Sequence, residues 1–538
     1  MFDVLIRRGT IVDGTGRPRF VGDLAISDGQ IREVGPSITE PAKRVIEAEG
    51  LMVCPGFIDV HAHDDLAVLH DHELPYKLMQ GITTTIIGNC GHSVAPMPVD
   101  EALRDALRAY VEPVLGRWGE KQQSFGYLNI GDYYEALETT EQSVNVGALV
   151  GHGPLRVRVM GFADRRATPA EITQMQQLLA EAMAAGALGL SLGLMYTPGC
   201  FADKEELIAL AQTVKSYDGI VTAHIRGEGD LLLPSIEEML EMAQASNVSL
   251  HISHLKAVGR HNWGTVDKAI QRIRAARSAG LDVTCDAYPY AAGSTTLLSL
   301  LPPWMLQDGV GGVLAHLADA QTRARVAQAL AAQGDGWENV ALITGWERVV
   351  LTSSAGSQIY QGKSIAEVAE MLHCDAVEAY FRVIEATEGI GTIVIHHMAD
   401  ADVERVLAFE HATVGSDGLP SREGHPHPRL YGTFPRFISK YVRESGVLTL
   451  EQAVQKVTSF AVDRFQLGQR GRLLPGYVAD VVVFDFAAFS DAATYAEPKQ
   501  FAPGLAYVLV NGELVCERGN AVGAHPGQLI HRKHASVC

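Results

Sequence analysis

The chain has little cysteine and no long apolar run. Its 538 residues include seven cysteines without the regular spacing of a disulfide framework, which excludes a disulfide-stapled secreted scaffold and fits a reducing compartment. No apolar stretch approaches the about 20 residues of a membrane-spanning helix, and the opening residues lack the apolar core of a signal peptide. We therefore predict a cytoplasmic protein with no membrane partner.

Positive charge is also in short supply. Asp and Glu number 63 against 44 Lys and Arg, which gives a formal net charge of -19. This balance argues against nucleic acid and anionic membrane as partners. The partner that we expect is a small-molecule substrate. The sequence does not indicate whether the protein is a monomer or an oligomer. With 47% hydrophobic residues, the chain is long enough to bury the cores of two or three domains.

Both ends of the chain have the pattern of β-strands joined by tight turns. In residues 1–54, short runs rich in Val and Ile close at Asp-Gly or Gly, and residues 470–538 repeat the pattern in "LAYVLVNGELVCERG". Asn-Gly and Asp-Gly between alternating apolar residues are strong hairpin signals. We predict that residues 1–54 and 470–538 together form one small β-sandwich domain.

Between the two ends, strand-like runs alternate with amphipathic helices. Eight such runs lie between "GFIDVHAH" and "HATVGSDG", and repeated βα units of this length predict a parallel sheet with covered faces. We predict a (β/α)8 TIM-like barrel over residues 55–469. The stretch 297–388 interrupts the rhythm and predicts a helix-rich insertion between strands seven and eight. Because long insertions at a barrel mouth often cover substrate, we expect this insertion to act as a lid.

Metal-competent side chains stand where these strands end. In "PGFIDVHAHDD", His61 and His63 are two residues apart and therefore project from the same face of an extended chain. The strand ends of a (β/α)8 barrel gather at one mouth, so these side chains should meet other strand-end residues there. Those residues are Cys90, His224, His251, His254, Lys256 and Asp417.

The types of these side chains indicate a metal and a reaction class. Imidazole and thiolate donors favour Zn²⁺ over Mg²⁺ or Ca²⁺, and zinc supplies a water of lowered pKa for hydrolysis. Asp417 is then suited to accept a proton from water and return it to a leaving group. The alternatives are scattered core histidines and an Asp417 that only forms the turn in "SDG". We interpret His152 and His251 as supporting or structural residues rather than ligands.

At these residues the chain resembles the amidohydrolase superfamily, and within it the N-acyl-D-amino-acid deacylases, or D-aminoacylases. The resemblance covers nearly the whole chain. It rests on "PGFIDVHAHDD", "GITTTIIGNCGHSVAP", "GALGLSLGLMYTPG", "HISHLK", "DAYPYAAGST" and "GSDGLP…HPRLYGTFPRF". The cysteine of "GNCG" distinguishes this group from relatives that carry a carboxylated lysine.

The resemblance implies a role for each metal ligand. One tightly bound Zn²⁺ is expected at Cys90, His224 and His254. A second, weaker Zn²⁺ site is expected at His61 and His63, with the cysteine bridging the two ions.

The resemblance also implies a proton shuttle and a substrate clamp. The shuttle matches Asp417. The clamp for the substrate α-carboxylate matches Lys256, Tyr288, Ser294 and Arg429, which supply the cations and hydroxyls that a carboxylate in a dry pocket needs. For Arg429, a structural ion pair is the alternative.

The substrate side chain is less well defined. Met195, Tyr196 and Met398 are expected near the mouth, and their thioether and aromatic surfaces favour an apolar side chain. An acidic side chain stays open, because the insertion could contribute a cation. Gly153 and Gly227 stand where the family more often has polar residues, which leaves the exact substrate undefined.

We predict zinc-dependent hydrolysis of the amide bond of N-acyl-D-amino acids, which releases a carboxylate and a free D-amino acid. The first alternative is a cyclic-amide hydrolase resembling hydantoinases and dihydropyrimidinases. A remote alternative is a non-catalytic scaffold with the same fold.

Overall fold

The middle of the chain forms a barrel of parallel strands. The computed structural model describes residues 1–116, 126–354, 358–421 and 424–532. Within these residues, strands pair in parallel from β6 to β8 and from β9 to β17, and only Leu149 separates β8 from β9. A parallel bridge between Ala62 and Gly418 joins the segments that follow the first and last strands. This confirms the predicted (β/α)8 barrel, whose strands are β6 (Phe57–Asp59), β7 (Ile82–Ile87), β8 (Asn145–Ala148) with β9 (Val150–Gly151), β10 (Gly189–Gly193), β11 (Ile220–His224), β12 (Ser249–Ile252), β13 (Val283–Ala287) and β17 (Ala412–Val414).

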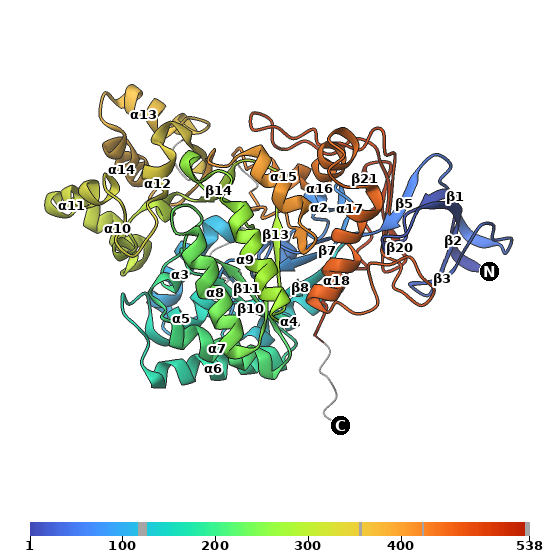
Figure 1. The fold of residues 1–538 in the computed structure, drawn as a ribbon, viewed down its shortest axis with the longest axis horizontal. Helices are drawn as coiled ribbons and strands as arrows, with labels where there is room; N and C mark the ends of the chain where they lie inside the picture. Colours follow the sequence, from blue (N-terminus) through green and yellow to red (C-terminus); the bar gives the residue numbers. More distant parts are fainter. Residues whose placement is uncertain (117–125, 355–357, 422–423, 533–538) are drawn as a thin grey trace.

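Helices cover the outside of this barrel (Figure 1). Helix α6 begins where Thr168 and Glu171 form a capping box around Pro169, which satisfies free N–H groups of the first turn. Buried residues such as Leu207 and Val214 lie on one side of α7, and this side packs on the sheet. No described helix has both the length and the apolar character to cross a membrane. Outside the insertion, the α-helices are α1 (Ala67–His70), α2 (Pro75–Leu78), α3 (Glu101–Leu115), α4 (Ile130–Thr139), α5 (His152–Met160), α6 (Pro169–Ala184), α7 (Lys204–Ser216), α8 (Leu232–Ser246), α9 (Val266–Ser278), α15 (Asp400–Ala408), α16 (Arg429–Arg436), α17 (Leu450–Lys456) and α18 (Ser459–Phe465), and a π-helix over Phe437–Glu444 continues α16.

The two chain ends share one nine-stranded sheet. Antiparallel pairing of β5 with β18 joins the N-terminal strands to the C-terminal ones. A bridge between Gln30 and Val478 brings β3 back towards the segment before β18, so the sheet curls around its own apolar core. This confirms the small β-sandwich built from both chain ends. Its strands are β1 (Phe2–Ile11), β2 (Phe20–Ser27), β3 (Gln30–Gly35), β4 (Ala42–Glu47), β5 (Met52–Pro55), β18 (Val481–Phe484), β19 (Leu505–Val510), β20 (Glu513–Glu517) and β21 (Asn520–Ala521).

A single glycine connects the last N-terminal strand of the small sheet to the first strand of the barrel. Only Gly56 separates β5 from β6, and a Cβ there would lie 2.2 Å from a neighbouring side chain, so a larger residue would not fit without a shift. Near the C-terminus, residues 526–530 leave the small sheet and pair with the barrel at β8. For the folded chain we propose the division into 1–54 with 470–538 and 55–469, with this late segment lying on the barrel.

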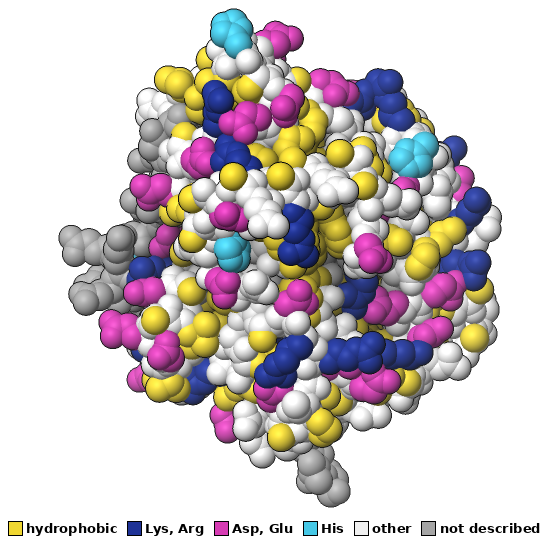
Figure 2. Space-filling view, turned by 90° about the vertical axis from the view of Figure 1, so that its left-hand side faces the viewer, with side chains coloured by type: hydrophobic (Ala, Val, Ile, Leu, Met, Phe, Trp, Pro, Cys, Tyr) yellow, Lys and Arg dark blue, Asp and Glu magenta, His cyan; other side chains and the backbone are white. Residues whose placement is uncertain are grey.

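A long insertion separates β13 from β17. Residues 297–388 are helix-rich, as predicted, and their strand β15 pairs with β16 in an antiparallel sheet of order β14–β16–β15 that the sequence did not predict; β14 and β16 lie just outside the predicted bounds. The helices of the insertion lie at the end of the molecule opposite the small sheet (Figure 1), on a face where acidic and basic side chains are intermixed (Figure 2). The helices and strands of the insertion and its two flanking strands are β14 (Gly293–Thr296), α10 (Gly309–Ala318), α11 (Ala320–Leu330), α12 (Val340–Thr344), β15 (Val349–Ser354), α13 (Ile365–Leu372), α14 (Ala376–Ala386) and β16 (Gly391–Ile395).

Candidate active site

Six side chains at or just beyond the ends of barrel strands meet at one mouth of the barrel. Among the described residues they form two groups of donor atoms that could hold a metal ion, and within each group the atoms lie within 4.8 Å of one another. All six side chains are buried. The first group is His61, His63, Cys90 and Asp417, and the second is Cys90, His224 and His254.

The donor atoms fit a metal in chemistry as well as in spacing. Sγ of Cys90 lies 3.2 Å from Nε2 of His61 and 3.4 Å from Nε2 of His254. Both ring nitrogens of His224 are buried, and the described residues offer them no hydrogen-bond partner. Buried nitrogens without a partner are costly, and coordination to a metal would satisfy one of them. A set of imidazoles and one thiolate is the donor chemistry that zinc prefers.

Three residues of the two groups have an unusual backbone conformation. Cys90, His254 and Asp417 have φ angles of 53°, 34° and 49°, in the left-handed region that costs residues other than glycine about 1–3 kcal/mol each. Local hydrogen bonds hold two of these conformations. Asp417 N donates to His61 O at 2.7 Å, and His254 N donates to Asp286 Oδ1 at 2.9 Å.

Two carboxylates orient the histidines from behind. Asp286 Oδ2 lies 3.2 Å from Nδ1 of His61 and 3.0 Å from Nε2 of His251. Glu228 Oε1 lies 2.9 Å from Nδ1 of His254. Because each carboxylate binds the Nδ1 of a metal-competent histidine, the Nε2 atoms of His61 and His254 face Cys90. His251 therefore supports the site without belonging to a donor group.

The sequence prediction missed both of these carboxylates. Asp286 stands in β13, near the strand's C-terminal end, so the rule that identified the ligands could also have found it. Glu228 lies in a loop four residues after His224 and has no such signal. His152, for which we expected a supporting role, has Nε2 2.7 Å from Glu206 Oε1 and belongs to neither donor group.

The site keeps its thiol and its strand-end carboxyl ionised. Burial raises the pKa of Cys90, but the charges of His61 and His254 outweigh burial and hold this pKa well below its ordinary value. Burial also opposes ionisation of Asp417, whose pKa is nevertheless lowered by Arg429 and by His61. Arg429 Nη1 lies 2.9 Å from Asp417 Oδ2. Asp417 is therefore negatively charged at neutral pH.

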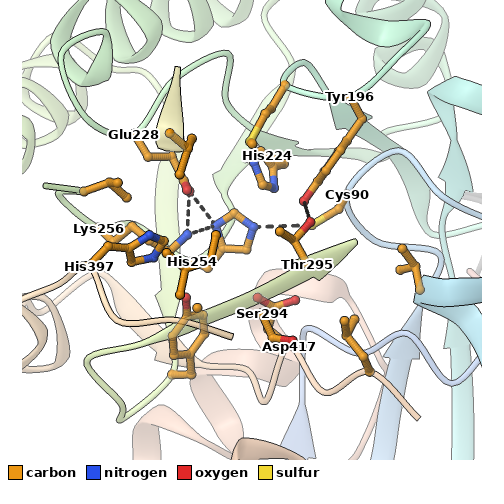
Figure 3. A pocket seen from close by; sticks show the side chains of 18 of the residues that line it. Cys90, Tyr196, His224, Glu228, His254, Lys256, Ser294, Thr295, His397 and Asp417 are labelled. Carbon is orange, nitrogen blue, oxygen red and sulfur yellow. Dashed lines mark hydrogen bonds and ion pairs between the residues drawn. The ribbon is translucent and has the colours of Figure 1, made fainter. Parts of the chain in front are cut away.

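A pocket extends from the donor groups (Figure 3). Of the predicted substrate-binding residues, Lys256, Tyr288, Ser294, Met195 and Tyr196 line it. The hydroxyl of Tyr196 lies 3.0 Å from the hydroxyl of a neighbouring threonine in β14. Much of the remaining wall is apolar and consists of Val114, Val258, Val340, Ile395 and Leu419.

Two predicted substrate-binding residues lie outside the lining of this pocket. Met398 packs against Tyr288 and borders a smaller cavity next to it. The side chain of Arg429 is fully buried, and its guanidinium lies over the Tyr288 ring at 4.5 Å. Arg429 Nη2 donates to Ser294 O at 3.1 Å. The ion pair of Arg429 with Asp417 matches the alternative prediction of a structural role. The hydrogen bond to Ser294 O places the guanidinium directly behind the wall of the pocket.

Besides Glu228, three titratable residues that the sequence did not reveal line the pocket: His92, Glu338 and His397. Glu338 comes from the insertion, and its carboxylate accepts backbone N–H groups of the loop after β11 at 2.7–3.0 Å. A Cβ on Gly227 would lie 2.6 Å from Leu231 Cβ and 3.0 Å from Glu338 Oε1, so the packing of this loop against Leu231 and Glu338 leaves no room for a larger residue. No strand or helix periodicity marks these positions.

Comparison with known proteins agrees with this geometry. Residues 44–516 match the model of the amidohydrolase family. A D-aminoacylase of Alcaligenes xylosoxydans xylosoxydans is 35% identical over 99% of this chain and 98% of the relative, and an N-acyl-D-glutamate deacylase of the same organism is 36% identical over 99% and 97%. A crystal structure of N-acyl-D-glutamate deacylase from Bordetella bronchiseptica, with zinc and a phosphonate inhibitor, has a TM-score of 0.83 at 35% identity and covers 98% of this chain and 99% of its own. A D-aminoacylase structure described for its binuclear metal center has a TM-score of 0.82 at 34% identity and covers 99% of this chain and 100% of its own.

Proposed function

Since the chain belongs to the amidohydrolase family, and within it to the N-acyl-D-amino-acid deacylases, we propose that it hydrolyses the amide bond of N-acyl-D-amino acids. The products are a carboxylate and a free D-amino acid. The observation that carries this proposal is the pair of donor groups that share Cys90 at the mouth of the barrel.

The metal in this proposal is Zn²⁺. Cys90, His224 and His254 would hold the tight ion, and His61 and His63 would hold a second, weaker one together with Cys90. Zinc bound there would lower the pKa of a water molecule and polarise the scissile carbonyl. The zinc in the similar N-acyl-D-glutamate deacylase structure supports this choice.

Asp417 is the proton shuttle in this proposal. Its ionised carboxylate accepts a proton from the attacking water and later passes it to the nitrogen of the departing amine. His63 Nε2 lies 3.1 Å from Oδ1, and the Arg429 guanidinium contacts Oδ2. The ion pair with Arg429 lowers the pKa of the Asp417 carboxyl, and both contacts support its position beside the donor groups.

The substrate is bound through its α-carboxylate and its side chain. Lys256, Tyr288 and Ser294 supply donors for the carboxylate, with Arg429 directly behind them. Met195, Tyr196 and the apolar wall accept the side chain, and Met398 backs this wall. The insertion, residues 297–388, closes the pocket as a lid through Glu338 and Val340, which both line it.

The test compares three substrates on metal-saturated protein: N-acetyl-D-methionine, N-acetyl-L-methionine and a 5-substituted hydantoin. We expect hydrolysis of the D-compound alone, with zinc found by elemental analysis. Preferential hydrolysis of the hydantoin would contradict the proposal in favour of a cyclic-amide hydrolase. Protein that binds no metal and hydrolyses none of the three would indicate a scaffold.

A further inference from the structure

His397 is a buried histidine whose ring has no hydrogen-bond partner. Its exposed fraction is 6%, it lines the pocket beside Lys256 (Figure 3), and neither ring nitrogen contacts a partner among the described residues. Its backbone, in contrast, is firmly held: His397 O accepts from Gly259 N at 3.0 Å and from Trp263 Nε1 at 3.1 Å. A positioned polar ring without a partner is costly in the free protein, which indicates that a ligand supplies the partner.

The space in front of this ring is kept open by a glycine. A Cβ built on Gly293 would lie 2.9 Å from His397 Nε2 and 3.3 Å from the Tyr288 hydroxyl. The two polar atoms therefore border the same gap in the pocket wall. Lys256 and Ser294 line the same pocket, so the gap is surrounded mainly by groups that donate hydrogen bonds.

The cation in this part of the pocket is already paired. Lys256 Nζ lies 2.5 Å from Glu228 Oε1 and 2.7 Å from His254 Nδ1. A substrate carboxylate therefore meets an ammonium whose charge is largely balanced, and additional neutral donors gain importance. Burial, followed by the charge of Lys256, lowers the pKa of His397 to about 3, so its ring is neutral at physiological pH and carries one N–H.

We propose that His397 binds the substrate α-carboxylate, donating its ring N–H into the gap beside Gly293 and the Tyr288 hydroxyl. His397 is then a substrate-positioning residue of this site. The inference rests on the proposed deacylase function. It adds to the carboxylate clamp a residue that lies just after β16. It also gives Gly293 a role, because only a residue without a Cβ leaves the gap open.

The test uses paired substrates and paired variants. Kinetic constants of the metal-saturated enzyme are measured for N-acetyl-D-methionine and for its carboxamide, which lacks the charge. For the carboxamide, the inhibition constant against the free acid replaces KM where turnover is too slow to follow. His397→Leu removes the donor, His397→Gln retains one, and His396→Leu is the control, because the His396 ring packs on Tyr495 at 4.8 Å and lies outside the pocket lining.

For the free acid, His397→Leu should lower kcat/KM about 10- to 100-fold, as expected for a lost hydrogen bond to a charged group, mainly through KM. The same variant should change the carboxamide constant less than about threefold, His397→Gln should recover most of the loss, and His396→Leu should match the parent. Equal losses for acid and carboxamide would overturn the inference in favour of a structural role.

A second variant fills the gap without removing the histidine. Gly293→Ala should raise KM for the free acid more than it affects the carboxamide, with metal content and thermal midpoint close to the parent. An unchanged KM for the acid would also overturn the inference. Failure of the parent enzyme to hydrolyse any N-acyl-D-amino acid would instead count against the proposed function, so the two failures are distinguishable.

Discussion

The barrel strands and the insertion build the two sides of the pocket in different ways. The barrel contributes donors such as His61 and His254, which stand just after parallel strands and are oriented by the buried carboxylates of Asp286 and Glu228. The insertion contributes Glu338, from the loop before α12, and Val340, the first residue of α12, which both line the pocket where much of its wall is apolar. The metal-competent groups thus sit on the rigid scaffold, while the insertion adds part of the recognition surface to the residues that follow the barrel strands.

This contrast leads to an expectation for mutations. Changes to the donor groups of the barrel and to the residues that support them should remove metal or chemistry and therefore act on kcat and metal content. Changes on the insertion side should leave the metal in place and act on KM. The following experiments test this division, from the largest expected effect to the smallest.

Removal of the shared thiolate should have the largest effect. Cys90→Ala takes a donor from both groups, so the protein should lose its tightly bound zinc and nearly all activity. His61→Ala, which affects one group, should lose less metal. Cys285→Ala is the control, because Cys285 is a buried cysteine of β13 outside both groups. Full zinc and normal turnover in Cys90→Ala, measured by elemental analysis and assay, would disprove the metal assignment.

Asp417→Asn should separate chemistry from metal binding. The amide keeps the shape of the side chain but cannot accept the proton, and loss of general acid–base catalysis costs about 10²–10⁴-fold in rate. We expect kcat to fall within this range while zinc, measured on the same sample, stays bound. A fall of less than about tenfold with full zinc would mean that another residue transfers the proton.

Asp286→Asn should weaken the metal site without removing a ligand. Its carboxylate contacts Nδ1 of His61 and the N–H of His254, and loss of such a supporting group typically costs about 10–100-fold in metal affinity or activity. Competition with a chelator measures this change. Asp282→Asn, at the opposite end of β13, is the control. Equal metal affinity in the Asp286 and Asp282 variants would argue against the supporting role.

Glu338→Gln tests the insertion side. The change weakens the hydrogen bonds to the loop after β11, which carries Glu228, so the pocket wall should loosen. Charged hydrogen bonds contribute about 1.5–3 kcal/mol, and we expect KM to rise about tenfold with unchanged zinc. Glu347→Gln, on the exposed part of the insertion, is the control. Loss of zinc in Glu338→Gln would break the division between the two sides.

The pH dependence of stability should also report on His397. Its pKa falls from 6.5 to about 3 on folding, so below pH 6.5 the unfolded chain takes up a proton that the folded chain does not. The stability from the neutral ring is therefore complete above pH 6.5 and is lost as the pH falls towards 3. At pH 5 the loss is about 2 kcal/mol. The midpoint of urea unfolding should decrease less between pH 7.5 and pH 5 for His397→Leu than for the parent. An equal decrease in both proteins would contradict a neutral, buried His397 ring.

The sequence alone determined much of the barrel side. Parallel strands place their C-terminal ends at one mouth, so a linear pattern of strands is enough to predict that His61, Cys90, His224 and His254 converge. Alternation of apolar residues with Asn-Gly and Asp-Gly turns likewise predicted the small sheet at both chain ends. These conclusions needed only local patterns and one general property of a fold.

Only the tertiary structure decided the remaining contacts. Glu228, Glu338 and His397 lie in loops or in the insertion, where no period relates sequence position to direction, so their partners depend on how distant segments pack. The same is true of Arg429, whose type suits either a substrate carboxylate or an ion pair. Its contact with Asp417 exists because α16 packs against the turn after β17. Such pairings depend on distances of a few ångströms between residues that no helix or strand period relates, which a local sequence pattern does not specify.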